Sequence, residues 1–476
     1  MRSSCKVGLI TMLDPRPEFL ENYREDFGQD ALDPSQAYES FRVMVRDAIS
    51  GDGTEVVEAG PVDSHFDTVN AVRKILRHEI HAFVIHIPGW THPSFTALAA
   101  RMAHARGVPV LLWASLALSG PSASKGAIDE MGIPVRILYG TPADELTVTR
   151  TRQFLRAAHT FKSLEGSRFG MLGGRSMGVN TGAVDPSEWL RLFGIDADHT
   201  DQLEIVRRAE KLDSEIVGTY VRWLQDSFGR VVYDQRRVTD ETVERAVRSY
   251  LATREIIEEK GYEFIALKCQ PELSDGFVNQ CLSHALLNDP YDAEGSKEPI
   301  CCSCEADGNG ALTMHILKHL SGGKPVLFAD VITFDDEQNA LICQNCGGAP
   351  TWFADANAEG AAKLKSVDVV PNVQGQAGGP ALNYYGAPVS TITWARLARR
   401  SGSYFMQIVK GELVEVSEMF RHFLMKWPTV AVRIDEDVRT FMETCPSQHI
   451  QLVAADVADE LEEFCRIAGI PFELTT

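Results

Sequence analysis

Short apolar runs alternate with amphipathic helical segments along the N-terminal part of the chain. Strands are predicted from four of these runs, Lys6–Thr11, Glu55–Glu58, Ala82–Ile87 and Pro109–Ala114. Helices are predicted from the periodic stretches between them, Ser35–Ile49, Thr68–Ile80 and Ser94–Arg106. Strand and helix in regular alternation are typical of a doubly wound, mostly parallel sheet. The pattern therefore predicts an α/β domain over residues 1–165.

A second α/β unit is predicted over residues 166–350. The segment RFGMLGGRSMGVNTG has the pattern of a strand that runs into a glycine-rich loop, and the loop spacing fits neither a P-loop nor a dinucleotide-binding loop. Charged helical stretches follow, and the next predicted strand, Phe264–Cys269, leads directly to Gln270 and Glu272. We expect the polar residues that follow these strands, including Arg175 and Gln270, to face one cleft.

Two acids stand out because each follows an apolar run. The first run ends at Glu305, and the second, Pro325–Ala329, ends at Asp330, with a helical segment between them. Strand, helix and strand in this order predict a βαβ unit with parallel neighbouring strands. Ligands collect at the carboxyl ends of such strands, and two carboxylates share a site only with a proton or a cation between them. The stretch predicts a divalent metal site or a general acid–base pair; for each acid alone, as for Asp307, a helix cap or a solvated loop is the competing interpretation.

The pattern changes after residue 350. Several predicted strands follow without helices between them, at Ser366–Val370, Ala387–Ala395, Tyr404–Glu412 and Thr429–Ile434. Consecutive strands of this kind are typical of an antiparallel domain or barrel. We therefore expect a β-rich, barrel-like C-terminal domain over residues 351–476, closed by a last helix at Val457–Ala468.

Composition narrows the class of protein. The chain has 476 residues, 44% hydrophobic and 24% charged, which is ordinary for a globular protein of about two to four domains. A formal charge of −20 argues against non-specific binding to nucleic acid or anionic membranes. No segment reaches the apolar length of a membrane span, and Val7–Leu13 fits a first strand better than a signal peptide.

The ten cysteines are clustered, so we expect reduced thiols and a cytoplasmic protein.

The cysteine cluster offers a competing metal site. Cys301, Cys302 and Cys304 precede Glu305, and a C-x-x-C pair follows at residues 343 and 346. Zinc sites need four ligands at loop or knuckle spacings, whereas successive residues of a strand face opposite sides. The pattern favours small buried cysteines, and a zinc-binding protein remains the alternative.

Other metal motifs are weak. A calcium loop starting at Glu305 would need a carboxylate at its twelfth position, where Ile316 stands. His315 and His319 share a helix face, but no H-E-x-x-H motif surrounds them, so we interpret them as surface or packing residues. His449 follows a Pro-Ser-Gln turn and is a stronger candidate.

Several segments resemble one known family in a conserved order along the chain. CEADGNGALTMHIL and PVLFADV are similar to the signature region of the L-fucose isomerase/L-arabinose isomerase superfamily, on the L-fucose isomerase side. DPRPEF, RSMGVNTGAVDPSEWLRLFGID, FMQIVKGE, KWPTVAV and SQHIQLVAADVADELEEFCRIAGIPF resemble other segments of that family in the same order. The resemblance spans nearly the whole chain.

The resemblance implies two Rossmann-like α/β domains followed by a β-rich domain. It implies a metal, usually Mn²⁺, held by Glu305, Asp330 and His449, an oxygen-rich set suited to a hard divalent ion. The implied reaction is aldose–ketose isomerisation through an enediol, with the two acids moving the proton. Implied substrate-binding residues are Arg16, Trp90, Met177, Gln270 and Trp427. The first two would serve a neighbouring subunit of a homo-oligomer, a trimer or a hexamer.

Three differences between this sequence and the family pattern bear on which sugar the protein accepts. Gln448 stands where the fucose enzymes carry asparagine, the C-terminal domain is short, and NVQGQAGGPALNYYG does not match the sugar-contacting loop. The expected substrate is a pentose, a deoxyhexose or a modified hexose such as a sulfo-sugar. A non-catalytic sugar-binding protein on the same scaffold is the second alternative.

Overall fold

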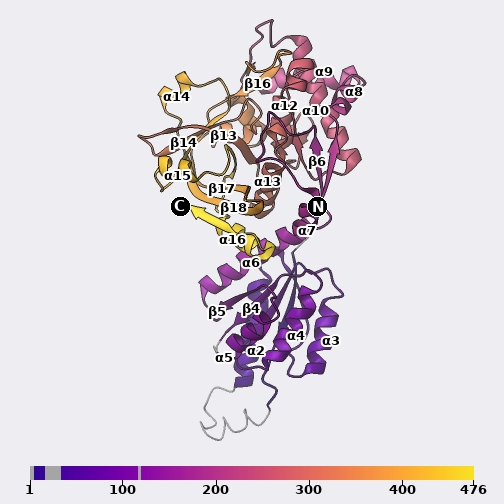
Figure 1. Ribbon diagram of the computed structural model, residues 1–476, viewed down its shortest axis with the longest axis vertical. Coiled ribbons are helices and arrows are strands. Elements are labelled where there is room, and N and C mark those ends of the chain that lie inside the picture. The colour runs from indigo at the N-terminus through magenta and orange to yellow at the C-terminus, as the bar shows by residue number, and fades with distance from the viewer. Residues whose placement is uncertain (1–4, 17–33, 116–118, 476) are drawn as a thin grey trace. The chain divides into compact units, whose positions relative to one another are not determined.

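A computed structural model describes residues 5–16, 34–115 and 119–475 of the chain (Figure 1). The chain divides into two compact units, Met1–Ser163 and Leu164–Thr476. No helix among the described residues combines the length and apolar character needed to cross a membrane.

The first unit is built on a parallel sheet with the strand order β2-β1-β3-β4-β5. Its strands are β1 (Lys6–Thr11), β2 (Glu55–Glu58), β3 (Ala82–Ile87), β4 (Val110–Ala114) and β5 (Val135–Tyr139). Its helices are α2 (Pro34–Ile49), α3 (His65–Ile75), α4 (Pro93–His104), α5 (Ser119–Asp129) and α6 (Glu145–Ser163). Helices α3, α4 and α5 pack side by side, and α2 packs with α6. The predicted doubly wound α/β domain is confirmed.

The second unit opens with another parallel sheet, of order β12-β9-β6-β7. Its strands are β6 (Arg168–Leu172), β7 (Asp196–Thr200), β9 (Phe264–Leu267) and β12 (Cys302–Ser303). The helices of this part are α7 (Pro186–Phe193), α8 (Leu203–Ala209), α9 (Ser214–Ser227), α10 (Asp240–Lys260), α11 (Glu272–Gly276), α12 (Cys281–Asn288) and α13 (Gly308–Leu320). Short strands form two small sheets: β10 (Tyr291–Asp292) with β11 (Gly295–Ser296), and β8 (Arg230–Val231) with β15 (Asp368–Pro371) and β16 (Pro380–Asn383).

The rest of the second unit is a closed antiparallel barrel. Around the ring the strands are β17 (Val389–Arg400), β20 (His449–Val453), β13 (Val326–Asp335), β14 (Ala340–Gln344), β19 (Thr429–Arg433) and β18 (Ser403–Val414), and β18 pairs with β17 to close it. Strand β21 (Phe472–Thr475) adds to β18, and three helices complete the unit, α14 (Glu418–Phe423), α15 (Val438–Thr444) and α16 (Ala458–Ala468). Trp394 of β17 and Phe441 of α15 meet edge to face at 5.3 Å between ring centroids, both fully buried. The predicted barrel-like C-terminal fold is confirmed.

The predicted βαβ unit around α13 is wrong. Strand β12 lies in the parallel sheet beside β9, whereas β13 runs antiparallel to β14 and β20 in the barrel. The reason is local: β13 continues to Asp335, turns within a few residues and pairs with the equally apolar β14 as a hairpin. The barrel thus draws strands from both sides of residue 350. Helix α13 contacts β9 and β12 on one side and β13, β17 and β20 on the other, so it joins the two layers.

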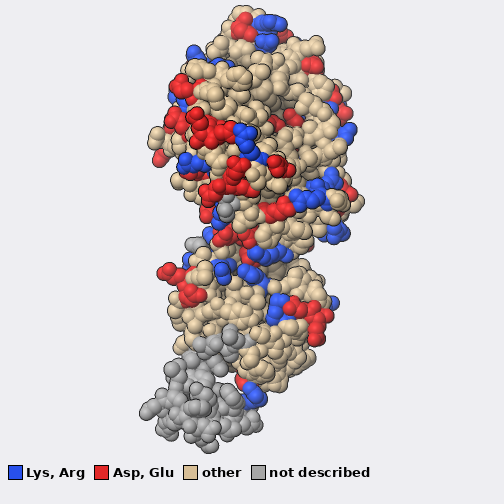
Figure 2. Space-filling model, turned by 60° about the vertical axis from the view of Figure 1, so that its left-hand side comes forward, with Lys and Arg blue, Asp and Glu red and all other residues tan. Residues whose placement is uncertain are grey.

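Charge is unevenly distributed over the surface. Figure 2 shows Asp and Glu side chains gathered on the visible face of the second unit, with Lys and Arg between them. This fits the formal charge of −20 and keeps that face from attracting polyanions.

Candidate metal centre

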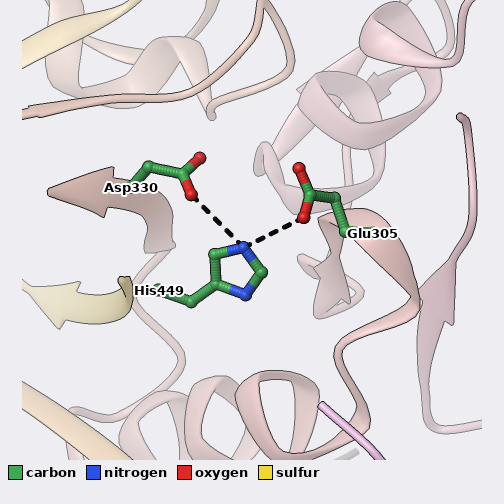
Figure 3. Close-up of side chains that lie close together, drawn as sticks. All are labelled: Glu305, Asp330 and His449. Carbon is green, nitrogen blue, oxygen red and sulfur yellow. Dashed lines mark ion pairs between the residues drawn. The ribbon is translucent and has the colours of Figure 1, made fainter. Parts of the chain in front are cut away.

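Three side chains from separate elements meet at the junction of the α/β layer and the barrel (Figure 3). Glu305 lies between β12 and α13, Asp330 in β13 and His449 at the start of β20. One ligand atom from each lies within 4.8 Å of the other two. Nε2 of His449 is 3.2 Å from a Glu305 oxygen and 3.3 Å from an Asp330 oxygen. The structure therefore brings together the three residues that the sequence singled out.

The pairing register of β13 and β20 positions two of these three side chains, those of Asp330 and His449. Asp330 and His449 are direct partners in the antiparallel β13–β20 pair, so their side chains project from the same face of the sheet. The imidazole is fully buried and packs against Phe328, with 4.8 Å between ring centroids. Its neighbour Gln448, the noted departure from the family, places its amide nitrogen 3.3 Å from Nε2.

Glu305 reaches the same point through an unusual backbone conformation. Its φ and ψ angles are 57° and 24°, and φ of Ala306 is 52°. Left-handed geometry costs non-glycine residues about 1–3 kcal/mol and tends to occur at functional sites. Here it lies in the four residues, 304–307, that connect the short strand β12 to α13, and it leaves the Glu305 carboxylate facing His449.

Asp307 occupies the other side of the imidazole. Its carboxylate lies 2.7 Å from Nδ1 of His449, accepts hydrogen bonds from both Nη groups of Arg396 at 2.5 and 3.2 Å, and accepts one from the Gly310 amide at 2.8 Å. Asp307, Arg396 and His449 are each at most 1% exposed. The cap predicted for Asp307 is present, because the Gly310 contact is the N-cap bond of α13. The same carboxylate also orients the histidine.

This arrangement requires a positive charge on the Nε2 side. Because Asp307 accepts a hydrogen bond from Nδ1, an unprotonated ring would point its Nε2 lone pair at two carboxylates. Burial lowers the pKa of His449, but its hydrogen bonds to Asp307, Asp330 and Glu305 outweigh burial and raise that pKa well above the ordinary value. Burial likewise raises the pKa of Asp307, and the Arg396 charge with the His449 contact more than reverses this. A proton or a cation between the three groups satisfies them.

The residues present fit a bound divalent metal. Two carboxylates and one imidazole are a ligand set for a hard or borderline ion, and a metal-binding histidine usually donates its other ring N–H to a carboxylate, as His449 can to Asp307. The side chains of Glu305 and Asp330 are 14% and 26% exposed. An ion held there would keep an open side toward solvent, which a catalytic site needs and a closed structural site lacks.

The alternative metal sites lack this geometry. Among the described residues, Glu305, Asp330 and His449 form the only group of three with ligand atoms close enough to share an ion. Cys301, Cys302, Cys304 and Cys343 are buried, as expected for small interior residues. His315 stacks on Phe264 with 4.4 Å between centroids and contacts His319 through Nε2 at 3.2 Å, which agrees with the packing role predicted for this pair.

Three of the predicted sugar-binding residues lie in loops of the second unit. Met177 is 54% exposed in the loop after β6, and its neighbour Ser176 donates a hydrogen bond to the Gln270 carbonyl at 3.1 Å. The Gln270 amide bonds to Gln374. Trp427 lies two residues before β19, which begins at Thr429.

The other two predicted residues belong to the first unit. The Arg16 guanidinium lies 5.8 Å from the centre of the Trp90 ring and pairs with Asp14 at 2.6 Å. Arg16 and Trp90 therefore lie beside each other. The remainder of the DPRPEF segment, from Pro17 on, lies outside the described residues. Their role in a sugar site remains a prediction.

Arg396 is the residue that sequence reasoning missed. It stands in the middle of β17 within an ordinary strand pattern, and no motif marks it. Asp307 carried a partial signal, since it lies two residues after Glu305 at a helix start. Both roles depend on contacts between residues far apart in the sequence.

Gly182 supplies the space that Asp307 needs, and this is testable. A Cβ at Gly182 would lie 2.8 Å from Cα and 3.1 Å from Oδ1 of Asp307, so backbone must shift. We expect Gly182→Ala to lower the free energy of unfolding by about 1–3 kcal/mol. Gly174→Ala, in the same loop with no atom within 4 Å, is the control and should change it by less than about 0.5 kcal/mol. Urea unfolding measures both, and equal losses would contradict the close approach.

Comparison with known proteins gives several sugar isomerases to which this chain is similar. Residues 343–475 match the family described as L-fucose isomerase, C-terminal domain. A sulfoquinovose isomerase of Alkalicoccus urumqiensis is 25% identical over 384 residues, covering 76% of this chain and 80% of that protein. One from Clostridium sp. (strain MSTE9) is 23% identical over 382 residues, covering 77% and 80%. An L-fucose isomerase of Haemophilus influenzae (strain PittEE) is 26% identical over 258 residues, 48% of this chain but only 42% of that protein.

The protein contains parallel sheets covered by helices and a closed barrel, and a carboxylate–imidazole centre lies where α13 joins the second sheet to the barrel. These features define an α/β protein with a candidate metal site. The matches support a protein of the L-fucose isomerase-like kind, since the C-terminal family model and the sugar isomerases named above are what this chain is similar to. The resemblance found in the sequence is thereby confirmed.

Proposed function

We propose that this protein is a metal-dependent aldose–ketose isomerase that acts on a monosaccharide and uses Mn²⁺ bound by Glu305, Asp330 and His449. The observation that carries the proposal is the meeting of two partly exposed carboxylates with a buried imidazole that a third, buried carboxylate orients. A protein that only binds sugar needs polar and aromatic contacts but no such set.

The two partly exposed acids, Glu305 and Asp330, perform the proton transfer. Interconversion of an aldose and its ketose moves one hydrogen between neighbouring carbons through an enediol, and a carboxylate within reach of both carbons can take it and return it. Glu305 and Asp330 approach His449 Nε2 from two sides at 3.2 and 3.3 Å, so one can act at the carbons and the other at the oxygens. When bound, the cation would supply Lewis-acid polarisation of the sugar. Asp307 and Arg396 hold the imidazole in place beneath them.

Substrate contacts are assigned to the residues that the family resemblance implies. We assign Met177, Gln270 and Trp427 of the second unit to sugar binding. Arg16 and Trp90 would complete the site of a neighbouring subunit in a homo-oligomer, a trimer or a hexamer. Each of these residues lies in a loop that follows or precedes a strand end, where ligand-binding residues are concentrated in α/β proteins.

The choice of sugars to test follows from the relatives. The sulfoquinovose isomerases cover about three quarters of the chain, 76% for the first, and the L-fucose isomerase covers 48%. A panel should therefore hold sulfoquinovose beside L-fucose, D-arabinose, L-arabinose and L-rhamnose. We propose a modified hexose, a deoxyhexose or a pentose as the substrate class.

Removal and return of metal test the proposal. The protein would be stripped with a chelator and assayed for ketose formation on the panel, with and without added Mn²⁺. We expect turnover of at least one sugar that is lost on stripping and restored by the ion. Turnover unaffected by stripping would contradict the metal-dependent mechanism. A sugar that raises the melting temperature of the Mn²⁺-loaded protein without being converted would instead support a binding protein.

A further inference from the structure

Half of the cysteines gather at one place in the second unit, around His284 of α12. The chain has ten cysteines, and all are free thiols. The gathered ones come from four separate segments: Cys269, Cys281, Cys302, Cys304 and Cys346. They share no metal, since no three of their side chains in the described part of the chain lie at the spacing for one ion. The cluster has no part in the proposed sugar chemistry.

Cys346 lies at the centre of this cluster. It follows β14 in the turn before Gly347, and its sulfur lies within hydrogen-bonding reach of the thiols of Cys281 and Cys304. These two thiols lie in α12 and just after β12. A sulfur with two thiols in reach can be stabilised as a thiolate, the form in which cysteine reacts.

Cys281 is held especially close to the Cys346 turn. Its Sγ lies 3.2 Å from the Cys346 carbonyl oxygen. The Asn372 amide donates to that same Sγ at 3.1 Å and to the Cys346 carbonyl at 3.0 Å, so it fixes the two residues together. A Cβ on Gly347 would lie only 3.2 Å from the Cys281 sulfur. The backbone can pass this near because residue 347 is a glycine with φ of 117°.

His284 gives an independent indication of a reactive site. It is 2% exposed, and its Nδ1 contacts the Cys302 sulfur at 3.2 Å. Its Nε2 is buried with no hydrogen-bond partner among the described residues, and burial lowers the pKa of His284 to about 4, so the ring is neutral. A buried imidazole nitrogen without a partner beside a sulfur can exchange a proton with a molecule that reacts there.

Exposure and acidity distinguish Cys346 from its neighbours. Cys346 retains partial exposure, whereas Cys281 and Cys304 are 3% and 4% exposed. The two thiol hydrogen bonds lower the pKa of Cys346 well below its ordinary value. Hydrogen bonding to Cys346 and burial raise the pKa of Cys281 well above it. An accessible, acidic thiol beside a buried, neutral one is the usual arrangement of an attacking and a resolving cysteine.

We propose that Cys346 is an oxidation site for peroxides and that Cys281 resolves it as a disulfide. In the first step the Cys346 thiolate attacks one peroxide oxygen, the O–O bond breaks, and the sulfur becomes a sulfenic acid while the other oxygen leaves as water or alcohol after protonation. In the second step the Cys281 sulfur displaces hydroxide from the sulfenic sulfur, its proton completes a second water, and an S–S bond forms. The peroxide accepts both electrons, and thiol reductants reverse the change.

The experiment uses the full-length, reduced and metal-stripped protein with limiting hydrogen peroxide. Tandem mass spectrometry of the digested protein, with and without dimedone to trap sulfenic acid, follows each cysteine. We expect Cys346 to react about ten-fold or more faster than Cys5 and Cys445, which are also partly exposed. We expect a Cys346–Cys281 disulfide that dithiothreitol removes. Reaction no faster than at Cys5 and Cys445, or a disulfide to Cys304 instead, would overturn the assignment.

Matched variants separate the two roles. In Cys281→Ser the sulfenic acid at Cys346 should persist and be trapped, and in Cys346→Ser both products should vanish. Cys465→Ser, which removes a buried thiol of α16, should change neither. If Cys346→Ser fails to fold, competitive labelling of the native wild-type protein with iodoacetamide gives the same ranking of thiols. A soft metal retained by the thiols after chelation, without disulfide formation, would show a metal site and refute the proposal. None of these readouts depends on isomerase activity.

Discussion

Glu305→Gln is expected to remove sugar turnover while leaving the protein folded. Glutamine keeps the size of the side chain and one carbonyl oxygen, but it cannot accept the carbon-bound proton of the sugar. The loss of a general base of this kind costs about 10²–10⁴-fold in rate. Stability should change little, because the Glu305 carboxylate is partly exposed and its nearest charged partner is His449 at 3.2 Å.

Ketose formation at saturating Mn²⁺ measures this effect, since saturation offsets any weaker binding of the ion. Exchange of the sugar's carbon-bound hydrogen with D₂O is a second readout that detects proton abstraction even when product formation is slow. Glu337→Gln is the control, because Glu337 is exposed in the β13–β14 hairpin and should keep wild-type rates. If Glu305→Gln turned over sugar at the wild-type rate, the assignment of the proton transfer to this carboxylate would be wrong.

Local pattern was sufficient for the order of most elements and drew attention to the acids of the candidate metal site. Apolar runs such as Ala82–Ile87 matched the strands to the residue, because a parallel strand covered on both faces needs a continuous apolar segment. The successive predicted strands after residue 350, with no predicted helix between them, indicated the barrel. Asp330 was found as a polar residue at the end of an apolar run and His449 by the Pro-Ser-Gln turn before it, and the resemblance to a family joined them with Glu305.

Local sequence pattern could not predict how the strand before Asp330 pairs, nor the Arg396–Asp307 contact that supports the candidate site. The apolar run before Asp330 fits a parallel strand and a barrel strand equally well, and only pairing with β20 decides between them. That pairing, not a shared parallel sheet, brings Asp330 beside His449. Arg396 is an arginine within an apolar strand, and its purpose depends on Asp307, which is distant in sequence and reached only after α13 has packed on β17.

Asp307→Asn is expected to weaken metal binding without removing any ligand atom. Asp307 accepts the hydrogen bond from Nδ1 of His449, which directs the Nε2 lone pair toward the ion and makes it more basic. An asparagine can present its NH₂ group there and favour the wrong tautomer. Loss of a group that orients a metal-binding histidine typically costs about 10–100-fold in affinity, and we expect that loss in a Mn²⁺ titration followed by calorimetry.

The same change must be separated from unfolding, because Asp307 also pairs with buried Arg396 and caps α13. Leaving a buried charge with a weakened partner costs up to about 3–5 kcal/mol, so the folded fraction is measured by circular dichroism before each titration. Asp335→Asn is the matched control, because Asp335 is a 5% exposed acid of the same unit that accepts hydrogen bonds from the turn residues Glu337 and Gln338. It should lose stability but keep Mn²⁺ affinity.

Nitrogen NMR of the metal-free protein gives the decisive observation. In the wild type the proton at Nδ1 of His449 should be held at every pH at which Asp307 is ionised, and in Asp307→Asn the neutral ring, observed above its pKa, should show a mixture of tautomers. Unchanged nitrogen shifts together with lost affinity would mean that Asp307 acts through the fold and not on the imidazole. Unchanged affinity in a folded Asp307→Asn protein would mean that the β13–β20 register and the Phe328 contact alone position His449.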